Sequence, residues 1–206
     1  MHIPDGYLSI PVVVGCGAIS ICGLFIAGRR MRGSIDQAQV PAVGVIAAFI
    51  FAAQMINFPI AGGTSGHVLG GVLSAVLVGP EAAVLIMSIV LIVQALLFGD
   101  GGILSLGANI FNMALIGAWG GFLLFRLFKK LLQKDTMALG VAAWLSVVIP
   151  ASMCAIELSL SGSVALSVAL PLMAGIHAVI GIGEAIVTIV AISLVRRVRP
   201  EIVLRG

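Results

Sequence analysis

Residues 82–98 of this chain read AAVLIMSIVLIVQALLF, a run without a charged side chain. A helix rises about 1.5 Å per residue, so about 20 apolar residues cross a hydrocarbon core about 30 Å thick. The whole chain resembles this run, because 61% of its 206 residues are hydrophobic and only 9% are charged. A soluble domain carries about 25% charged residues. The sequence therefore predicts an all-α fold, a polytopic bundle of membrane-spanning helices.

Seven apolar runs divide the chain and set the expected number of helices. The third run is short and rich in glycine, so we expect a broken or buried helix there. The last run is too long for one untilted helix. Pro171 could open the final helix at its first turn and leave 161–170 as a re-entrant or loop segment; the alternative is one unbroken helix. The runs cover residues 8–28, 41–57, 67–79, 82–98, 103–128, 137–158 and 163–195.

The basic residues predict how the bundle is oriented. With seven crossings and the N-terminus outside, every basic cluster faces the cytoplasm, whereas six crossings place at least one cluster outside. Cytoplasmic loops carry the excess of Lys and Arg, so we expect about seven helices, N-out and C-in, in one domain over residues 1–206. The eleven residues form three clusters: Arg29, Arg30 and Arg32; Arg126, Lys129, Lys130 and Lys134; and Arg196, Arg197, Arg199 and Arg205.

The composition also excludes several classes of function. The net charge of +3 comes from these clusters and not from a soluble basic face, so we expect no nucleic-acid partner. The sequence contains neither the GxxxxGK[ST] motif that cradles ATP phosphates nor the HExxH of zinc peptidases. We therefore expect no enzyme and no ATPase site, but a multi-pass protein of a prokaryotic cell membrane whose energy for any active transport comes from another chain.

The chain start, MHIPDG (1–6), has the donors of a metal chelator. It lacks the basic n-region of a signal peptide, and His2 is bulky, so we expect Met1 to remain as the terminus with a free amine. The Met1 amine and the His2 amide nitrogen would close a five-membered ring on a metal ion. The same amide and the His2 imidazole would close a six-membered ring. This planar nitrogen set suits Ni²⁺ or Cu²⁺ better than tetrahedral Zn²⁺.

A fourth nitrogen would complete the square, and His67 in GGTSGH (62–67) is the candidate. Glycines in this segment allow the backbone to approach the bound chain start. The alternatives are a histidine that only follows the initiator, an interfacial His67 bonded to a neighbouring hydroxyl, and glycines that only form a turn. Residues expected on the same side could orient the ligands through hydrogen bonds: Asp5, Asn57, Thr64, Ser65 and Asp100.

Other polar residues lie inside the apolar runs. His177 and Glu184 are seven residues apart and therefore share one helix face. Ionisable groups within a span are candidates for function, and the alternative is a structural hydrogen bond between helices. We assign Gln94, Asn109 and Asn112 to contacts between helices.

Four sequence blocks, spread over most of the chain, resemble the substrate-binding membrane component of nickel and cobalt transporters of the energy-coupling factor type. The IPDG form of the start is more similar to the nickel branch than to the cobalt branch. The blocks are MHIPDGYLS (1–9), GGTSGHVLGG (62–71), QALLFGDGGILSLGANIFNMA (94–114) and GIHAVIGIGEA (175–185).

The resemblance implies a metal site made by Met1, His2 and His67 in a seven-helix bundle. It implies Ni²⁺ or Co²⁺ as the transported ligand, with no further cofactor. It also implies three kinds of partner, namely a transmembrane coupling protein, ATPase subunits and a small accessory membrane protein. A passive divalent-metal channel and an intramembrane metalloenzyme are the rival classes. A vitamin-binding relative is disfavoured, because one Tyr and two Trp offer no aromatic-rich pocket.

Overall fold

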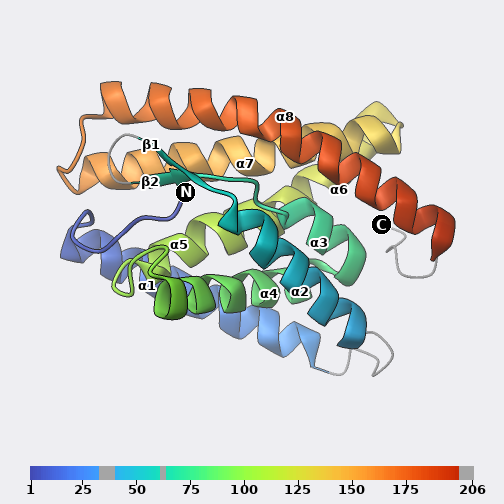
Figure 1. Cartoon of the computed structure of the whole chain (residues 1–206), viewed down its shortest axis with the longest axis horizontal. Coiled ribbons are helices and arrows are strands. Elements are labelled where there is room, and N and C mark those ends of the chain that lie inside the picture. The colour runs from blue at the N-terminus through green and yellow to red at the C-terminus, as the bar shows by residue number, and fades with distance from the viewer. Residues whose placement is uncertain (33–39, 61–63, 200–206) are drawn as a thin grey trace.

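The structure, a computed structural model, describes residues 1–32, 40–60 and 64–199. Most of these residues lie in helices packed side by side along the long axis of the molecule (Figure 1). The elements in chain order are α1 (Ile10–Met31), α2 (Val40–Met55), β1 (Phe58–Ile60), β2 (Thr64–Gly66), α3 (Gly71–Val78), α4 (Pro80–Val93), the π-helical η2 (Gln94–Phe98), α5 (Leu106–Ile110), the π-helical η3 (Phe111–Gly120), α6 (Gly121–Leu132), α7 (Asp135–Leu160) and α8 (Leu166–Val198).

Five helical stretches are long and apolar enough to cross a membrane: α1, α4 with η2, α5 through α6, α7, and α8. α2 is apolar but has only 16 residues. α3 has eight residues, about 12 Å of helix, and its residues 71–77 are buried. In the described part of the chain, seven continuous helices are therefore present, as expected, and the short run near 67–79 is a buried half-helix. The chain is a multi-pass membrane protein.

The last apolar run forms one unbroken helix, which is the second of the two alternatives for Pro171. α8 begins at Leu166, after the extended Ala165, and Pro171 lies inside it. Proline removes one helical hydrogen bond, whereas a loop through 161–170 would leave many backbone groups unpaired where a membrane offers no water. The lost bond is the smaller cost, and the connection from α7 shortens to residues 161–165.

A small hairpin corrects the all-α prediction. β1 pairs with β2 in antiparallel register, with Pro59 opposite Ser65. Three-residue strands carry too few positions to show an alternating pattern, so nothing in the sequence marked them. Gly62 and Gly63, expected to let the backbone approach the chain start or, as the alternative, to form a turn, lie outside the described residues.

The basic clusters gather at one end of the bundle. Arg196 contacts Asp135 at 3.2 Å, and Lys129 contacts the same carboxylate at 3.8 Å. Arg30 contacts Glu81, at the start of α4, at 3.8 Å. Figure 1 shows the ends of α1, α6 and α8 on this side, and the loops before α1, after η2 and before α8 on the other. All described basic residues therefore lie away from the chain start.

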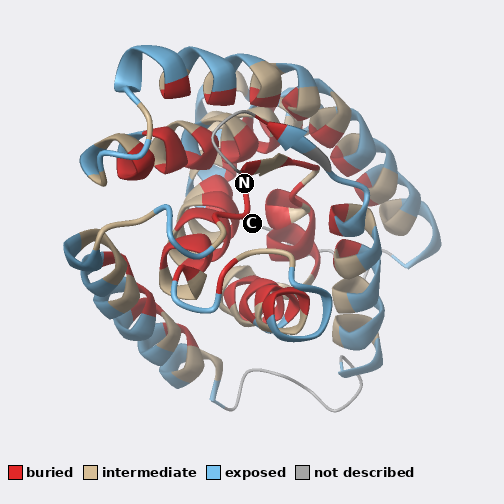
Figure 2. Ribbon diagram, turned by 60° about the vertical axis from the view of Figure 1, so that its left-hand side comes forward, coloured by how far each residue is buried: buried red, intermediate tan, exposed pale blue. Residues whose placement is uncertain are grey.

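The bundle is apolar outside as well as inside. Figure 2 shows buried residues facing the centre and exposed faces around the rim. Those rim faces carry large apolar side chains such as Phe25, Val45 and Val179, each more than 60% exposed. A surface of this kind fits lipid, because hydrocarbon tails solvate apolar side chains. Polar side chains that are buried in such a bundle then define where chemistry can occur.

Candidate metal centre

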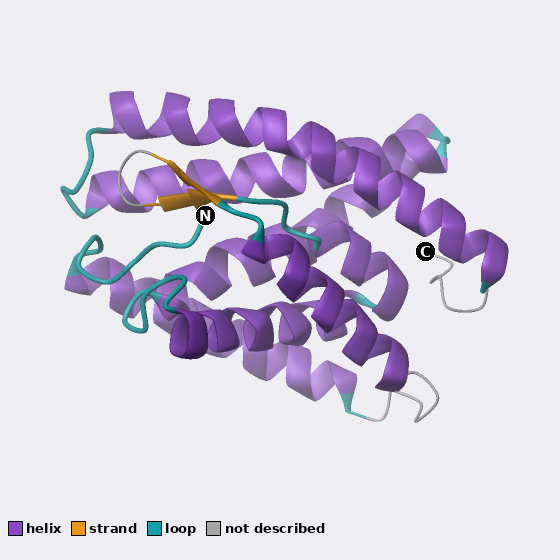
Figure 3. Cartoon of the chain, in the orientation of Figure 1, coloured by secondary structure: helices purple, strands orange, loops and turns teal. Residues whose placement is uncertain are grey.

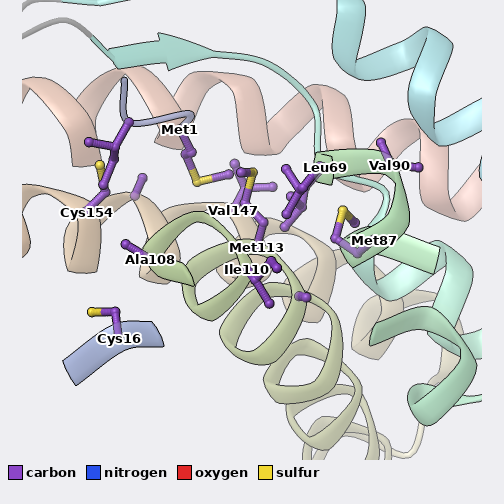
Figure 4. Packing of buried hydrophobic residues seen from close by; sticks show 14 of the residues in the cluster. Met1, Cys16, Leu69, Met87, Val90, Ala108, Ile110, Met113, Val147 and Cys154 are labelled. Carbon is purple, nitrogen blue, oxygen red and sulfur yellow. The ribbon is translucent and has the colours of Figure 1, made fainter. Parts of the chain in front are cut away.

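The first three residues lie in the centre of the bundle, beside the hairpin (Figure 3). Met1 and Ile3 are fully buried and His2 is 3% exposed. Figure 4 shows the Met1 side chain pointing inward among core residues that include Val147 and Met113. An extended segment buried in this way needs partners for its own backbone groups.

Asn109 supplies two of those partners. Its Oδ1 accepts the Ile3 amide at 2.9 Å, and its Nδ2 donates to the Ile3 carbonyl at 3.1 Å. The Gly102 amide donates to the same carbonyl at 2.9 Å. The side-chain amide thus pairs with the segment as a neighbouring strand would. The prediction that Asn109 joins helices is therefore wrong, because it holds the chain start.

Asp5 fixes the segment at its outer end. Its carboxylate accepts the amides of Ile103, Leu104 and Ser105 at 2.8–3.1 Å. These amides precede α5, and a helix N-terminus favours a negative charge. A β-carbon at Gly102 would overlap the carboxylate, so the close approach requires glycine. Asp5 thus docks the segment and does not contact the imidazoles.

Nitrogen atoms converge where the segment meets β2. The Met1 amine donates to the Ser65 carbonyl and lies 3.2 Å from His67 Nε2. The His2 and His67 rings stack at 4.6 Å between centroids, with 28° between their planes. Ser65 Oγ lies 3.3 Å from the Met1 amine, 3.3 Å from the His2 amide and 3.3 Å from His2 Nδ1. An oxygen equidistant from three nitrogens lies on the axis through the centre of that set.

A hydrogen bond assigns the tautomer of His67. His67 Nδ1–H donates to the Val68 carbonyl at 2.8 Å, which leaves the lone pair on Nε2, facing the Met1 amine. His2 has an acceptor at each ring nitrogen, with Gln94 Oε1 3.1 Å from Nε2 and Asp100 Oδ1 3.3 Å from Nδ1. Donation from Nε2–H to Gln94 leaves on Nδ1 the lone pair that the predicted chelate uses. Gln94, which we assigned to helix contacts, instead orients His2.

Burial keeps these nitrogens uncharged. It lowers the pKa of the Met1 amine from 8.0 to about 5, although the charge on Asp100 opposes this shift. Burial lowers the pKa of His2 to about 3, and the positive charge of the amine adds to the effect. It also lowers the pKa of His67 well below 6.5, with the charges of the amine, His2 and His177 adding to the shift. At neutral pH, all three groups hold free lone pairs.

A cavity of about 240 Å³ lies on the outer side of His2. Asp100 is at its wall, with Oδ1 3.3 Å from His2 Nδ1 and Oδ2 accepting Asn57 Nδ2 at 2.7 Å. Such a volume has room for a hydrated ion, since liquid water occupies about 30 Å³ per molecule. Its lining residues are His2, Pro4, Asn57, Pro59, Thr64, Ser65, Gly99, Asp100 and Gly101.

The remaining candidates lie apart from the converging nitrogens. The Thr64 hydroxyl donates to Met173 Sδ at 3.1 Å. Glu184 accepts the amides of Leu69 and Gly70 at 2.8 and 2.7 Å, so it secures the chain just after His67. In the described ranges, no group of three His, Cys, Asp or Glu side chains could hold a metal ion. A metal site with only two imidazoles at its centre needs further donor atoms, and backbone nitrogens can supply them.

Comparison with known proteins places the chain in a family. The model of the cobalt uptake substrate-specific transmembrane region matches residues 2–202. The chain belongs to this family. The crystal structure of a truncated transition metal transporter, 37% identical, superposes with a TM-score of 0.90 and covers 96% of this chain and 99% of that one.

Members of the cobalt uptake family with similar sequences carry the names of both metals. The putative fused nickel transport protein NikMN of Archaeoglobus fulgidus is 39% identical over 98% of this chain and 68% of its own length. The cobalt transport protein CbiM of Kyrpidia tusciae is 31% identical over all of this chain and 87% of its own length. The family thus includes metal transport proteins, and the family prediction from sequence is confirmed.

Proposed function

We propose that this chain is the substrate-capture subunit of an ATP-driven nickel uptake transporter and binds Ni²⁺ through Met1, His2 and His67. The observation that carries the proposal is the 3.2 Å approach of the Met1 amine to His67 Nε2, beside a His2 ring that stacks on His67 at 4.6 Å. Two short chelate rings and one distant imidazole then supply four nitrogens. Cobalt uptake by the same site is the alternative, since relatives carry the names of both metals.

The proposed binding step exchanges water for nitrogen. The ion enters the cavity beside Asp100, whose carboxylate attracts cations. It sheds water as the neutral amine and imidazoles bind, and the His2 amide releases its proton. Ser65 Oγ, on the axis of the three-nitrogen set, stays within reach of the ion. A planar strong-field set favours Ni²⁺ over Co²⁺ and Zn²⁺.

We also propose how the bundle is oriented in the membrane and which subunits it works with. The described basic residues share one end of the bundle, and the positive-inside rule puts that end in the cytoplasm. The chelate end then faces outside, in a single transmembrane domain. Energy comes from ATPase subunits through a transmembrane coupling protein, with a small accessory membrane protein as a further partner.

The decisive experiment blocks the amine. Two residues added before Met1 convert the amine to an amide and displace it from Ser65 and His67. We expect the affinity for Ni²⁺, measured by isothermal titration, to fall by more than about a hundred-fold, since loss of an outer partner of a ligand alone costs about 10–100-fold. His67→Ala should have a similar effect.

The control is the same extension added after Gly206, which should leave the affinity unchanged. An N-terminally extended chain that binds Ni²⁺ as tightly as the free one would refute the chelate. Parallel titrations with Co²⁺, Cu²⁺ and Zn²⁺ rank the metals. Flux of metal into liposomes that hold this chain alone, without ATP, would instead favour a passive channel.

A further inference from the structure

A third imidazole, that of His177 on α8, is buried without a partner for one of its nitrogens. The side chain is fully buried. Its Nδ1–H donates to the Met173 carbonyl at 2.8 Å, which leaves the lone pair on Nε2. Among the described residues, Nε2 has no hydrogen-bond partner. A buried unpaired nitrogen destabilises the fold, so its presence calls for an explanation.

Two contacts place His177 at the height of His67. Met173, four residues earlier on α8, receives a hydrogen bond from Thr64. Glu184, seven residues later, accepts the amides of Leu69 and Gly70. From Met173 to His177, α8 advances about 6 Å, and an extended chain covers that distance in about two residues. Two residues after Thr64 is Gly66, which is next to His67. His177 and His67 should therefore lie at a similar height along the bundle.

We propose that His177 Nε2 is an inner metal ligand, which takes the ion together with His67 when the N-terminal segment withdraws. This inference rests on the proposed function. Withdrawal of the segment removes three of four nitrogens at once and would leave the ion on His67 alone. A second imidazole at the same height, already in the tautomer that binds metals, keeps the ion coordinated during that step.

The exchange needs only water as a co-reactant. A bond forms between His177 Nε2 and the ion while the bonds to the Met1 amine and to the His2 amide and imidazole break. The His2 amide takes a proton from water, and the resulting hydroxide and a water molecule fill the two other positions on the ion. A square-planar ion is attacked along its open axis, so a nearby lone pair accelerates this exchange. His177 should therefore act on the rate of metal transfer far more than on equilibrium affinity.

The first test compares His177→Leu with Thr188→Val in the full chain. Thr188 is buried on the same face of α8, so it controls for changes in helix packing. With Ni²⁺ bound, we expect His177→Leu to slow transfer to excess EDTA about tenfold and to change the affinity less than threefold. Because the variant removes an unpaired nitrogen, its melting temperature should not fall. A transfer rate equal to that of Thr188→Val would overturn the proposal.

The second test detects the ligand directly, with Cu²⁺ as the probe. In the chain extended before Met1, pulsed EPR should show Cu²⁺ coupled to two imidazoles, and His177→Leu should reduce this to one. Coupling that does not change in His177→Leu would contradict an inner ligand. The two hypotheses fail separately: unchanged Ni²⁺ affinity in the extended chain refutes the N-terminal chelate, whereas unchanged coupling refutes only His177.

Discussion

One side-chain amide, that of Gln94, favours the His2 tautomer that leaves the lone pair on Nδ1. Its Oε1 accepts His2 Nε2–H across a separation of 92 residues. The opposite tautomer would place a hydrogen on Nδ1, the atom that closes the six-membered chelate ring. Gln94 is fully buried, and its own Nε2 has no partner among the described residues.

Replacement of Gln94 should weaken metal binding without removing a ligand. We expect Gln94→Leu to lower Ni²⁺ affinity about 10–100-fold, the usual effect of losing a partner that orients a ligand. Gln94→Glu should retain most of the affinity, since a carboxylate also accepts Nε2–H. Titration measures the affinity, and ¹⁵N NMR reports the His2 tautomer.

Gln54→Leu is the matched control, because Gln54 is also buried but donates to the Leu69 carbonyl and Met87. If Gln54→Leu and Gln94→Leu lose affinity equally, Gln94 has no special role in orienting His2.

At this scale, the sequence predicted the candidate ligands and two of their neighbours, Ser65 and Asp100, but not the supporting amides. Met1, His2 and His67 were found because ring sizes and a recognisable block point to them. Gln94 and Asn109 carry no such mark, since a lone amide in an apolar run does not reveal what it touches. Their partners, His2 and Ile3, lie about a hundred residues away in the chain.

At the scale of elements, the site depends on two irregular features. η2 begins at Gln94, and η3 follows directly after Ile110, one residue beyond Asn109. π-helical turns often occur at functional sites, and here they adjoin the two amides that hold the chain start. An apolar pattern that repeats every 3.6 residues predicts a helix but not a local π-helical turn. The sequence therefore could not show where η2 and η3 begin.

Docking of residues 1–5 should depend on pH through the buried amine. Its pKa falls from 8.0 to about 5 on docking, so between pH 5 and 8 the undocked segment binds more protons. Docking must then strengthen as pH rises through this window, by at most about tenfold per unit. Hydrogen exchange of the Ile3 amide, in metal-free protein and corrected for intrinsic rates, measures the effect.

Acetylation of Met1 removes this titrating group, so above about pH 7, where His2 and His67 are already neutral, any protection that remains should not vary with pH. Protection of Ile3 that is equally flat in the unmodified chain would show that the docked amine is not neutral.

At the scale of the whole molecule, hydropathy alone predicted the helices, and the charge pattern predicted their common basic end. The third run is short and rich in glycine, and the buried helix expected there is confirmed. α3 is as apolar as its neighbours but has eight residues. Its Gly71 lies against the backbone of Gly117, where a β-carbon would come within 2.9 Å of the carbonyl oxygen. An average of hydropathy over a window does not reveal such close packing of two backbones.

The orientation of the bundle can be tested with single cysteines. In a background without Cys16, Cys22 and Cys154, Ser163→Cys and Thr136→Cys mark exposed positions at the chelate end and the basic end. On right-side-out vesicles, an impermeant thiol reagent should label position 163 and leave 136 unlabelled until the vesicles are opened. The reverse pattern would invert the proposed topology.

The buried chain start also sets an order of events during biosynthesis. The first residues to leave the ribosome find their partners only after Ser65, Gln94 and Asn109 have been made. Residues 1–3 can therefore dock only after the chain has been made as far as α5, about a hundred residues later.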